Sequence, residues 1–591
     1  MALPPFGRSI LLAALGAIAL PVAALAQNPP TREEIERGRI DPNAPAGRAR
    51  LSVEGGVERA PCPLADPRFA DIRVTISDVQ FNGLKGLAPS DLRAAWAPYV
   101  GQSVPIATVC EIRDQAATLL RQAGYLAAVQ VPPQRIEADG VVRFDVLMAR
   151  LVGVQVRGDA GRSERIIAGY LGAIKDQEVF NVNEAERYLL LARDLPGYDV
   201  RLTLRPAGTV PGEVIGEVTV VHTPVEVDVN VQNYGSKDVG RFGGLARVQF
   251  NGLTGMGDST SLSVFSTADF DEQQVIQLGH VLRLGREGLA ISGDFTYAWT
   301  KPDIGASAPF RSETLSATLR ASYPLIRSQA RNLFVSGGMD YIDQEVRFGP
   351  TPISRDKLRV AFARLDYDST DPASITSTTG YSANEPRWRF GGAVEARQGL
   401  SIFDASRSCG AGFVRCIAPF TPISKAEADP TAFVFRGSAY FEVRPTPKIA
   451  FSLAPRVQYS SSPLLSYEEF SAGTYTIGRG FDPGTIIGDS GVGAAAEIKF
   501  GSLVPRRIDA FAVQPYAFFD AAWVWNEDSA FNGIDPQRLY SAGGGIRASW
   551  GNRGRFDLLA AVPLNTAGFQ TRRGDVRVLA SITLKLLPWN R

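Results

Sequence analysis

One arginine and one aspartate in this chain have surroundings that favour a specific ion pair. Arg479 lies between two glycines in the stretch TYTIGRGFDPG, residues 474–484, and Phe481 follows Gly480. Glycines permit unusual backbone angles and close approach to a neighbouring segment. A guanidinium matches a carboxylate with two parallel hydrogen bonds, and Asp520 is the acceptor that we expect. From the pattern alone, a solvent-facing Arg479 on an exposed loop is equally compatible.

The stretch around Asp520 has the alternation of a β-strand with two different faces. In VQPYAFFDAAWVW, the apolar set is Val513, Ala517, Phe519, Ala521, Trp523 and Trp525. Barrel strands of outer membranes alternate in this way between lipid and lumen. Asp520 and Phe518 belong to the other set and are predicted to face the lumen. In the last strand, Arg577 and Lys585 are predicted to do so too, because a cation in lipid would cost about 2–4 kcal/mol.

Similar alternating stretches recur from residue 225 to the end of the chain. We predict strands at 225–235, 241–250, 258–267, 273–284, 288–300, 312–324, 329–348, 356–369, 386–399, 431–444, 447–460, 490–501, 510–526, 537–550, 553–563 and 574–587. These are about 16, an even number, as bacterial outer-membrane barrels require. Two connections, 400–430 and 461–489, are long and predicted to be extracellular. A soluble array of β-sandwiches would not explain strands of this length.

A barrel of this size encloses an aqueous channel, which something is expected to fill. The 461–489 connection is too long for a simple hairpin and is predicted to enter the lumen. A second segment lies within residues 27–40, where Thr31 is a fair N-cap for a short polar helix. A helix without an apolar face is either solvated or held in a polar cavity, so this helix is a candidate plug.

The segments before the barrel divide into a leader, a linker and a repeat. Residues 1–26 resemble a cleaved secretory signal, with Arg8, an apolar run and an Ala24-Leu25-Ala26 site. A membrane anchor is the weaker alternative. Residues 41–70 are rich in Pro, Gly and Ala and are predicted to be a linker.

Residues 71–149 and 150–223 are weakly similar to each other, as VQFNGL and VQVRGD show, and each predicts a strand, two helices and two strands. An exposed strand edge in such a module can accept an extended chain, and the candidates are the strand at 198–204 with the helix at 183–195.

Cysteine and histidine content limits the chemistry that the chain can perform. The four cysteines form two plausible disulfides in an oxidising compartment, Cys62 with Cys110 and Cys409 with Cys416. Zinc is the competing interpretation, but neither of the two histidines, His222 and His280, lies near a cysteine, so we expect no metal and no cofactor. Neither histidine is placed to act as a catalytic base, and the sequence has no nucleotide-binding loop. We therefore expect that the protein is not an enzyme. A phospholipase-type barrel is a minor alternative. A net charge of +1 does not indicate nucleic-acid binding.

The stretch EEFSAGTYTIGRGFDPGTIIGDSGVGAAAEI resembles the sixth extracellular loop of two-partner secretion transporters of the hemolysin-activator type, with its Arg-Gly-Phe/Tyr motif. FFDAAWVW is similar to the Phe-x-Asp motif of their barrel wall, with Phe518 and Asp520 in the matching positions. The repeat resembles their tandem POTRA domains (polypeptide-transport-associated modules), and the polar helix resembles their plug helix. Gly478 departs from the family, which has a larger residue before the arginine.

The resemblance implies a membrane all-β protein: a 16-stranded outer-membrane β-barrel at 224–591, preceded by two α+β POTRA domains in the periplasm and a plug helix. It implies that Arg479, Gly480 and Phe481 latch the loop onto Phe518 and Asp520. The implied function is export of a large secreted exoprotein, adhesin- or hemolysin-like, captured by the POTRA domains. Outer-membrane lipid and, during biogenesis, the barrel assembly machinery are implied partners. The alternatives are a barrel-insertion factor of the same superfamily and a passive diffusion porin.

Overall fold

The structure is a computed structural model of the 591-residue chain. It describes residues 30–38, 50–53, 62–136, 139–208, 210–303, 309–375, 377, 379–507, 509–529, 533–568 and 572–589. The predicted signal at 1–26 therefore lies outside the described residues. Among the helices of the described part, none is both long enough and apolar enough to cross a membrane.

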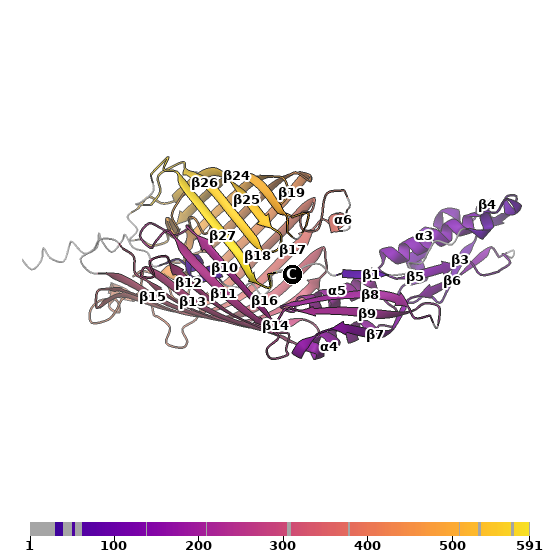
Figure 1. The fold of residues 1–591 in the computed structure, drawn as a ribbon, viewed down its shortest axis with the longest axis horizontal. Helices are drawn as coiled ribbons and strands as arrows, with labels where there is room; N and C mark the ends of the chain where they lie inside the picture. Colours follow the sequence, from indigo (N-terminus) through magenta and orange to yellow (C-terminus); the bar gives the residue numbers. More distant parts are fainter. Residues whose placement is uncertain are drawn as a thin grey trace, which may run out of the picture.

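Residues 225–587 form a closed antiparallel barrel (Figure 1). Its strands are β10 (Val225–Gln232), β11 (Gly243–Asn251), β12 (Ser259–Thr267), β13 (Gln273–Leu284), β14 (Leu289–Thr300), β15 (Phe310–Arg327), β16 (Arg331–Phe348), β17 (Thr351–Thr370), β18 (Trp388–Gly399), β19 (Phe433–Thr446), β20 (Ile449–Ser460), β23 (Ser490–Phe500), β24 (Phe511–Trp525), β25 (Gln537–Trp550), β26 (Gly554–Pro563) and β27 (Arg577–Leu587). β10 pairs with β27 and closes the ring. The prediction of a 16-stranded barrel is confirmed.

Alternation of side chains gives the barrel its two faces. On β24, Val513 and Phe519 are exposed on the outer face, whereas Asp520 is fully buried on the inner one. β27 shows the same pattern, with Val578 outside and Arg577 buried inside. Apolar side chains therefore cover the surface that lipid would contact, and charged side chains line the lumen.

The 461–489 connection contains structure of its own inside the barrel. A short hairpin, β21 (Phe470–Ala472) with β22 (Ile486–Gly488), carries the glycine-rich stretch at its tip. Phe470, Ile477 and Phe481 of this connection pack against Ala522 and Val524 of β24 in one apolar cluster. The loop is therefore folded against the inner wall, and we call residues 461–489 the latch loop.

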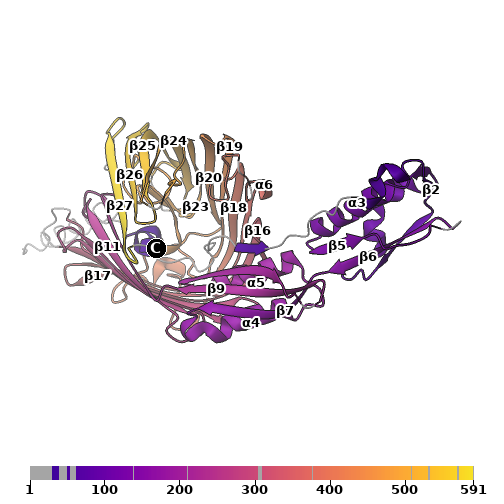
Figure 2. The ribbon, with the colours of Figure 1, turned by 45° about the vertical axis from the view of Figure 1, so that its right-hand side comes forward.

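Two α+β modules precede the barrel and extend from one end of it (Figure 2). The first contains β2 (Arg73–Thr75), β3 (Asp78–Asn82), β4 (Ser103–Pro105), α3 (Thr108–Gln122), β5 (Ala127–Gln130) and β6 (Val141–Met148). Its main sheet has the order β3-β6-β5. The first of its two predicted helical stretches is instead a pair of 3₁₀ turns, Pro89–Ala95 and Ala97–Tyr99. Pro89 and Pro98 occupy the first turn of each, where proline is tolerated, and prevent a continuous α-helix.

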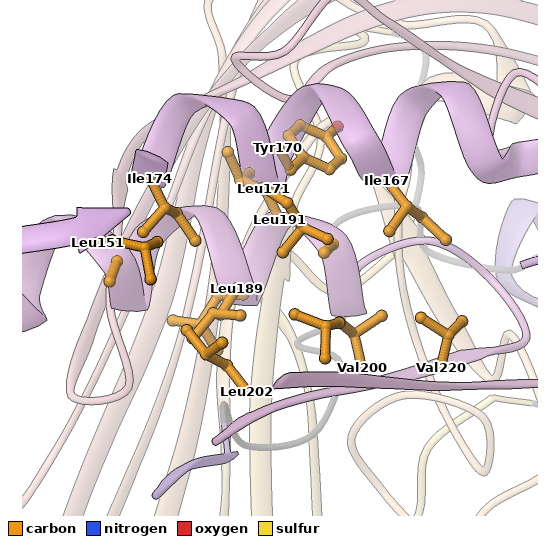
Figure 3. Packing of buried hydrophobic residues seen from close by; sticks show 14 of the residues in the cluster. Leu151, Ile167, Tyr170, Leu171, Ile174, Leu189, Leu191, Val200, Leu202 and Val220 are labelled. Carbon is orange, nitrogen blue, oxygen red and sulfur yellow. The ribbon is translucent and has the colours of Figure 1, made fainter. Parts of the chain in front are cut away.

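The second module is built in the same way and lies next to the barrel. It contains β7 (Arg150–Gly158), α4 (Glu164–Lys175), α5 (Val182–Arg193), β8 (Tyr198–Pro206) and β9 (Glu213–His222). Its helices cover one face of the sheet, where Ile167, Tyr170 and Leu191 pack over Val200 and Leu202 (Figure 3). These five side chains are all nearly or completely buried, so the module has a core of its own.

The segment before the modules departs from the simple linker that we predicted for 41–70. It contains a strand, β1 (Arg50–Val53), which pairs in parallel with Arg201–Leu204 of β8 and extends the sheet to the order β1-β8-β9-β7. Two 3₁₀ turns, Pro63–Ala65 and Pro67–Phe69, follow near the first module. Upstream lie α2 (Arg32–Ile35) and a 3₁₀ turn, Glu36–Gly38; we call residues 31–38 the lumenal helix.

Candidate functional site: the latch loop and the lumenal helix

Arg479 of the latch loop is bound to Asp520 of the barrel wall. Its Nη2 lies 2.6 Å from Asp520 Oδ1, its Nε lies 3.1 Å from Oδ2, and its backbone N–H also donates to Oδ2 at 2.9 Å. Ser541 of β25 donates a further hydrogen bond to Oδ2 at 3.2 Å. The Asp520 side chain is completely buried, so this is a bidentate, enclosed ion pair rather than a surface contact.

The guanidinium of Arg479 has two more partners on the wall. Its Nη1 lies 2.5 Å from Glu497 Oε1 of β23, and its Cζ lies 3.7 Å from the centre of the Phe518 ring. Arg547 of β25 holds both oxygens of Glu497, at 2.7 and 2.8 Å. Arg479, Asp520, Glu497 and Phe518 together form what we call the latch.

Glu497 and Arg547 were missed by the sequence analysis. Glu497 follows three alanines in GVGAAAEIKF and is the first charge after a long uncharged stretch of β23. In the structure, Glu497 is the register partner of Phe518 on the neighbouring strand. Glu497 could have been identified from the sequence, because it is a charged residue in the barrel strand next to the strand that carries Asp520.

The glycines beside Arg479 allow the loop tip to approach the wall closely. A Cβ on Gly480 would lie 2.8 Å from the Cβ of Ser541 and 2.9 Å from the backbone nitrogen of Pro563. Gly478 has φ of +119°, a conformation that favours glycine, and a Cβ there would meet Leu539 at 2.7 Å. Phe481, the next apolar residue, is completely buried. The tip therefore fits its wall only without side chains at both positions.

The lumenal helix lies inside the barrel and contacts the latch loop. Its carboxylate Glu33 pairs with Arg456 of β20 at 2.9 Å and accepts a hydrogen bond from Ser471 of the loop at 2.9 Å. Arg37 donates to Tyr475 of the loop at 2.8 Å and lies 3.8 Å from the centre of the Phe265 ring of the wall. The lumenal helix is therefore held by both the wall and the latch loop.

Ile35 corrects our expectation that this helix has no apolar face. Its side chain is completely buried in a cluster with wall residues such as Phe265 and Leu358, and with Leu465 and Tyr467 of the loop. Its carbonyl accepts a hydrogen bond from Gln277 at 3.1 Å. Burial alone raises the pKa of Glu33, but Arg32 and Arg456 outweigh it and lower that pKa to about 2. The carboxylate that anchors the helix is thus charged at neutral pH.

A second group of charges joins the latch loop to other strands of the wall, β16, β18 and β19. Arg397 of β18 lies 2.6 Å from Glu468 of the loop, and its guanidinium also contacts Asp340 of β16 at 2.9 Å. Arg436 of β19 contacts the same Glu468. These residues were also missed by the sequence analysis, because the charge of Glu468 lies in a loop without periodicity.

The long connection at 400–432 lies over the same region. It contains the Cys409–Cys416 disulfide, and Cys409 is buried in the cluster around Ile35. Lys425 of this connection pairs with Glu469 at 2.8 Å and with Asp489 at 3.0 Å, both in the latch loop. The other disulfide, Cys62–Cys110, joins the segment before the modules to α3.

Residues 217–548 match the sequence profile of the haemolysin secretion/activation protein family ShlB/FhaC/HecB. This match covers more than half of the 591 residues. The chain belongs to this family. Residues 74–148 also match the ShlB-type POTRA domain, so the first module is a POTRA domain.

Two curated relatives match part of this ShlB/FhaC/HecB chain. The heme/hemopexin transporter protein HuxB of Haemophilus influenzae (strain 86-028NP) is 25% identical over 243 residues, which cover 40% of this chain and 41% of that protein. The outer membrane transporter CdiB of Escherichia coli is 21% identical over 234 residues, 38% of this chain and 38% of that protein. The matched stretch therefore spans about two fifths of the length of these relatives.

Solved structures of the same fold cover nearly the whole chain. CdiB from Escherichia coli superposes with a TM-score of 0.69 at 17% sequence identity, over 94% of this chain and 96% of that one. CdiB from Acinetobacter baumannii gives a TM-score of 0.61 at 18% identity, over 90% of this chain and 91% of that one. At these identities the likeness concerns the fold alone.

Membership of the ShlB/FhaC/HecB family bears on two expectations from the sequence, the location of the protein and the absence of enzyme activity. The chain is an outer-membrane β-barrel protein with a periplasmic POTRA domain, as predicted. Because this is a family of transporters, the chain is not an enzyme. Arg327 at the end of β15 contacts Asp194 of the second module, so in this antiparallel barrel β18 and β20 end at the opposite mouth, where the connections 400–432 and 461–489 begin. With the modules in the periplasm, this mouth is the extracellular one.

Proposed function

We propose that this protein is the outer-membrane pore of a two-partner secretion system and exports one large exoprotein through its barrel lumen. The observation that supports this most directly is the way in which the lumen is closed. Two separate segments, the lumenal helix and the latch loop, occupy it, and both are held by side-chain contacts, ion pairs and apolar packing, rather than by pairing with the barrel strands. The contacts of the lumenal helix can be exchanged for contacts with a passing chain, so the part of the closure that this helix provides is reversible.

The domain organisation that we propose follows from this function. Residues 1–26 are a signal peptide, 27–40 a plug helix, 41–70 a linker, 71–149 and 150–223 two POTRA domains, and 224–591 the barrel. The match at 74–148 supports the first POTRA domain, and the equal strand order of the second module supports the second. In this scheme the POTRA domains receive an unfolded exoprotein in the periplasm.

The proposed role of the latch is to keep the loop tip against the wall while the pore is idle or in use. Arg479 supplies the charge, Gly480 the close approach, Phe481 the apolar anchor, and Asp520 with Phe518 the receptor on the wall. Asp520, which is fully buried, the half-buried Glu497 and the Phe518 ring surround the guanidinium of Arg479 and exclude water from much of it. The two disulfides are proposed to stabilise the segments outside the barrel strands.

The cargo is proposed at the level of a large secreted protein, adhesin- or hemolysin-like. HuxB is named as a heme/hemopexin transporter, whereas the name of CdiB specifies only an outer membrane transporter, so these two names define no common cargo. The alternative function, insertion of other barrels into the membrane, is less well supported, because the matching family is one of secretion proteins.

Export can be tested by co-expressing this protein with the large exported protein encoded beside its gene and measuring that partner in the culture medium. The proposal expects partner in the medium only when the intact chain is present, and loss of export when residues 71–223 are deleted. Unchanged solute flux after that deletion, without any exported partner, would instead indicate a passive porin. Defects in the assembly of other barrels would indicate an insertion factor.

A further inference from the structure

Residues 400–406, which we call the outer turn, lie against the outer face of β17. Leu358 of β17 points into the lumen, where it belongs to the same apolar cluster as the lumenal helix. Because side chains alternate along a strand, Lys357 and Arg359 lie on the outer face. The Nε of Arg359 donates to the carbonyl oxygen of Phe403 at 3.1 Å, and Lys357 pairs with the next residue of the turn. The connection that follows β18 is thus folded over the outside of the wall.

The arginine beneath the outer turn holds it in an uncommon conformation. Arg359 is fully buried, with its Cζ 3.4 Å from the centre of the Tyr341 ring and its Nη1 2.8 Å from Asp343 Oδ1. Above it, Phe403 and Asp404 have φ of +48° and +59°, values that are uncommon for residues other than glycine. Such conformations persist only where the surrounding contacts maintain them, so the wall fixes the shape of the turn.

The outer turn presents two apolar side chains at the edge of the lipid-facing surface. Ile402 and Phe403 are 42% and 67% exposed. On the periplasmic side of Arg359, the outward residues of β17 are apolar: Ala361, Ala363 and Leu365. On its extracellular side they are charged: Lys357 and Arg355. The turn therefore lies where the apolar band of the barrel ends and a charged surface begins.

This charged surface carries more cations than carboxylates. It comprises the outer faces of β15, β16 and β17 at their extracellular ends, together with the outer turn and the residue after it. Its cations are Arg311, Arg347, Arg355, Lys357, Arg359 and Arg407, and its carboxylates are Glu313, Asp343, Glu345 and Asp404. Lys357 and, at longer range, Arg407 lower the pKa of Asp404, which places Arg407 beside the turn.

Arg407 is the cation of this surface that is best placed to bind a ligand. It is exposed, and it forms no ion pair or hydrogen bond with another residue that the structure describes. The planar guanidinium binds phosphate oxygens with two parallel hydrogen bonds. Apolar side chains next to such a cation match a lipid, whose acyl chains and phosphate group lie side by side in the same way.

The same connection enters the lumen a few residues further on. From Phe403 to Cys409 the chain advances six residues, and Cys409 is buried in the cluster that contains Ile35 of the lumenal helix. Later in the connection, the backbone N–H of Ser424 donates to Asp356, on the lumenal side of β17, at 2.8 Å. One connection therefore crosses the rim of the barrel and holds both faces of β17.

We propose that the outer turn is a lipid anchor that helps to keep the lumenal helix in the pore. Ile402 and Phe403 enter the outer leaflet, and Arg407 binds the phosphate group of an anionic lipid there. A connection that lipid fixes on the outside keeps Cys409 packed against Ile35 on the inside. Without the anchor this cover loosens, and the helix leaves the pore more often. The inference rests on the proposed closure of the lumen by the helix and adds a lipid that regulates it.

The first test locates the outer turn relative to the bilayer. A spin label on Ile402→Cys is compared with labels on Leu319→Cys, which is 63% exposed on the apolar wall, and Val100→Cys, which is 43% exposed in the first module. The four native cysteines are in disulfides and do not take up the label. In vesicles of phosphatidylcholine and phosphatidylglycerol, the label at 402 is expected to meet oxygen dissolved in lipid and to be shielded from a water-soluble nickel chelate, like the label at 319. Accessibility like that at 100 would overturn the lipid contact.

The second test measures channel openings in planar bilayers of phosphatidylcholine with and without phosphatidylglycerol. Phosphatidylglycerol is expected to lower the opening frequency of the unmodified protein several-fold, and inorganic phosphate in solution to have no such effect. Arg407→Gln should lose this dependence, whereas the control Arg415→Gln, at the exposed arginine inside the disulfide loop, should keep it. The same dependence in Arg407→Gln as in the unmodified protein would refute the headgroup site.

The apolar half of the anchor is tested in the same bilayers. Phe403→Ser is expected to raise the opening frequency several-fold in both lipid mixtures. Phe413→Ser is the control, because Phe413 is also exposed but lies inside the loop that the Cys409–Cys416 disulfide closes. An opening frequency of Phe403→Ser equal to that of the unmodified protein would refute the link between the turn and the pore.

A deletion of residues 27–40 separates this inference from the closure on which it rests. In the deletion variant, Phe403→Ser is expected to have no further effect on the openings, because the helix that the anchor restrains is absent. A further increase would show that the turn does not act through the helix and would refute the inference. Unchanged conductance after the deletion alone would refute closure by the helix, while the spin-label result would still decide whether the turn contacts lipid.

Discussion

Glu33 of the lumenal helix and Ser471 of the latch loop are joined by a hydrogen bond of 2.9 Å between Oε2 and Oγ. The same carboxylate is anchored to the wall by Arg456. The two segments that occupy the barrel are therefore in contact with each other as well as with the wall. A change in one is therefore expected to affect the other.

Arg479→Ala is expected to abolish or strongly reduce export while the barrel still assembles. The substitution removes the cation that Asp520 shares with the half-buried Glu497. Asp520 is fully buried, and loss of one partner of a buried pair costs about 3–5 kcal/mol. Export is measured in the medium, and assembly by the heat-dependent mobility of the barrel in gels. Arg415→Ala, at an exposed arginine of the 400–432 connection, is the matched control. Normal export by Arg479→Ala would refute the role of the latch.

A double-mutant cycle on Arg479→Ala and Asp520→Ala is expected to show strong coupling. Since both side chains share the same contacts, the free energies of unfolding of the two single variants should not add. Directly bonded residues show interaction energies of about 0.5–3 kcal/mol, and urea unfolding of the protein in lipid vesicles measures them. Additive effects would mean that the two side chains act separately.

Gly480→Ala is expected to displace the loop tip and to reduce export as strongly as loss of the arginine. The added Cβ would lie within 3 Å of Ser541 and of the backbone at Pro563, which cannot move without disturbing two strands. Gly293→Ala in β14 is the control, because a Cβ there meets nothing within 4 Å. Protease sensitivity of the latch loop in intact cells should rise in Gly480→Ala and stay unchanged in Gly293→Ala.

Removal of residues 27–40 is expected to raise the conductance of the barrel in planar bilayers. This segment includes the lumenal helix, which contacts both wall and loop inside the lumen. Glu33→Gln removes the charge of the anchoring carboxylate. It is expected to make channel openings more frequent, but to raise the conductance less than the deletion does. Unchanged conductance after the deletion would show that the helix does not block the channel.

The parts of the fold that depend on periodicity could be predicted from the sequence. Asp520 was assigned to the lumen because its neighbours alternate regularly along β24. Charge made it one possible partner of Arg479, and the resemblance to two-partner secretion transporters implied that pairing. The lumenal orientation of Arg577 was predicted in the same way, and the buried side chain agrees with it.

Features that depend on distant contacts could not be predicted in this way. β1 lies in a segment rich in Pro, Gly and Ala, and only its pairing with β8, about 150 residues further on, makes it a strand. Glu468 binds Arg397 from a loop that has no repeating pattern. Ile35 has no helical stripe around it in the sequence, because its apolar partners come from the wall and the loops. In each case the partner is set by the tertiary fold and not by local sequence.

The central claim is that an exported chain passes through the lumen that the helix and the loop now occupy. The most direct measurement places a photo-cross-linking amino acid at Gln277, which faces the lumenal helix, or at the adjacent Ile276, which is exposed on the outer face. In cells with export in progress, we expect cross-links to the partner from position 277 and none from position 276. Active export with no cross-link at 277, or with equal cross-links at both positions, would contradict it.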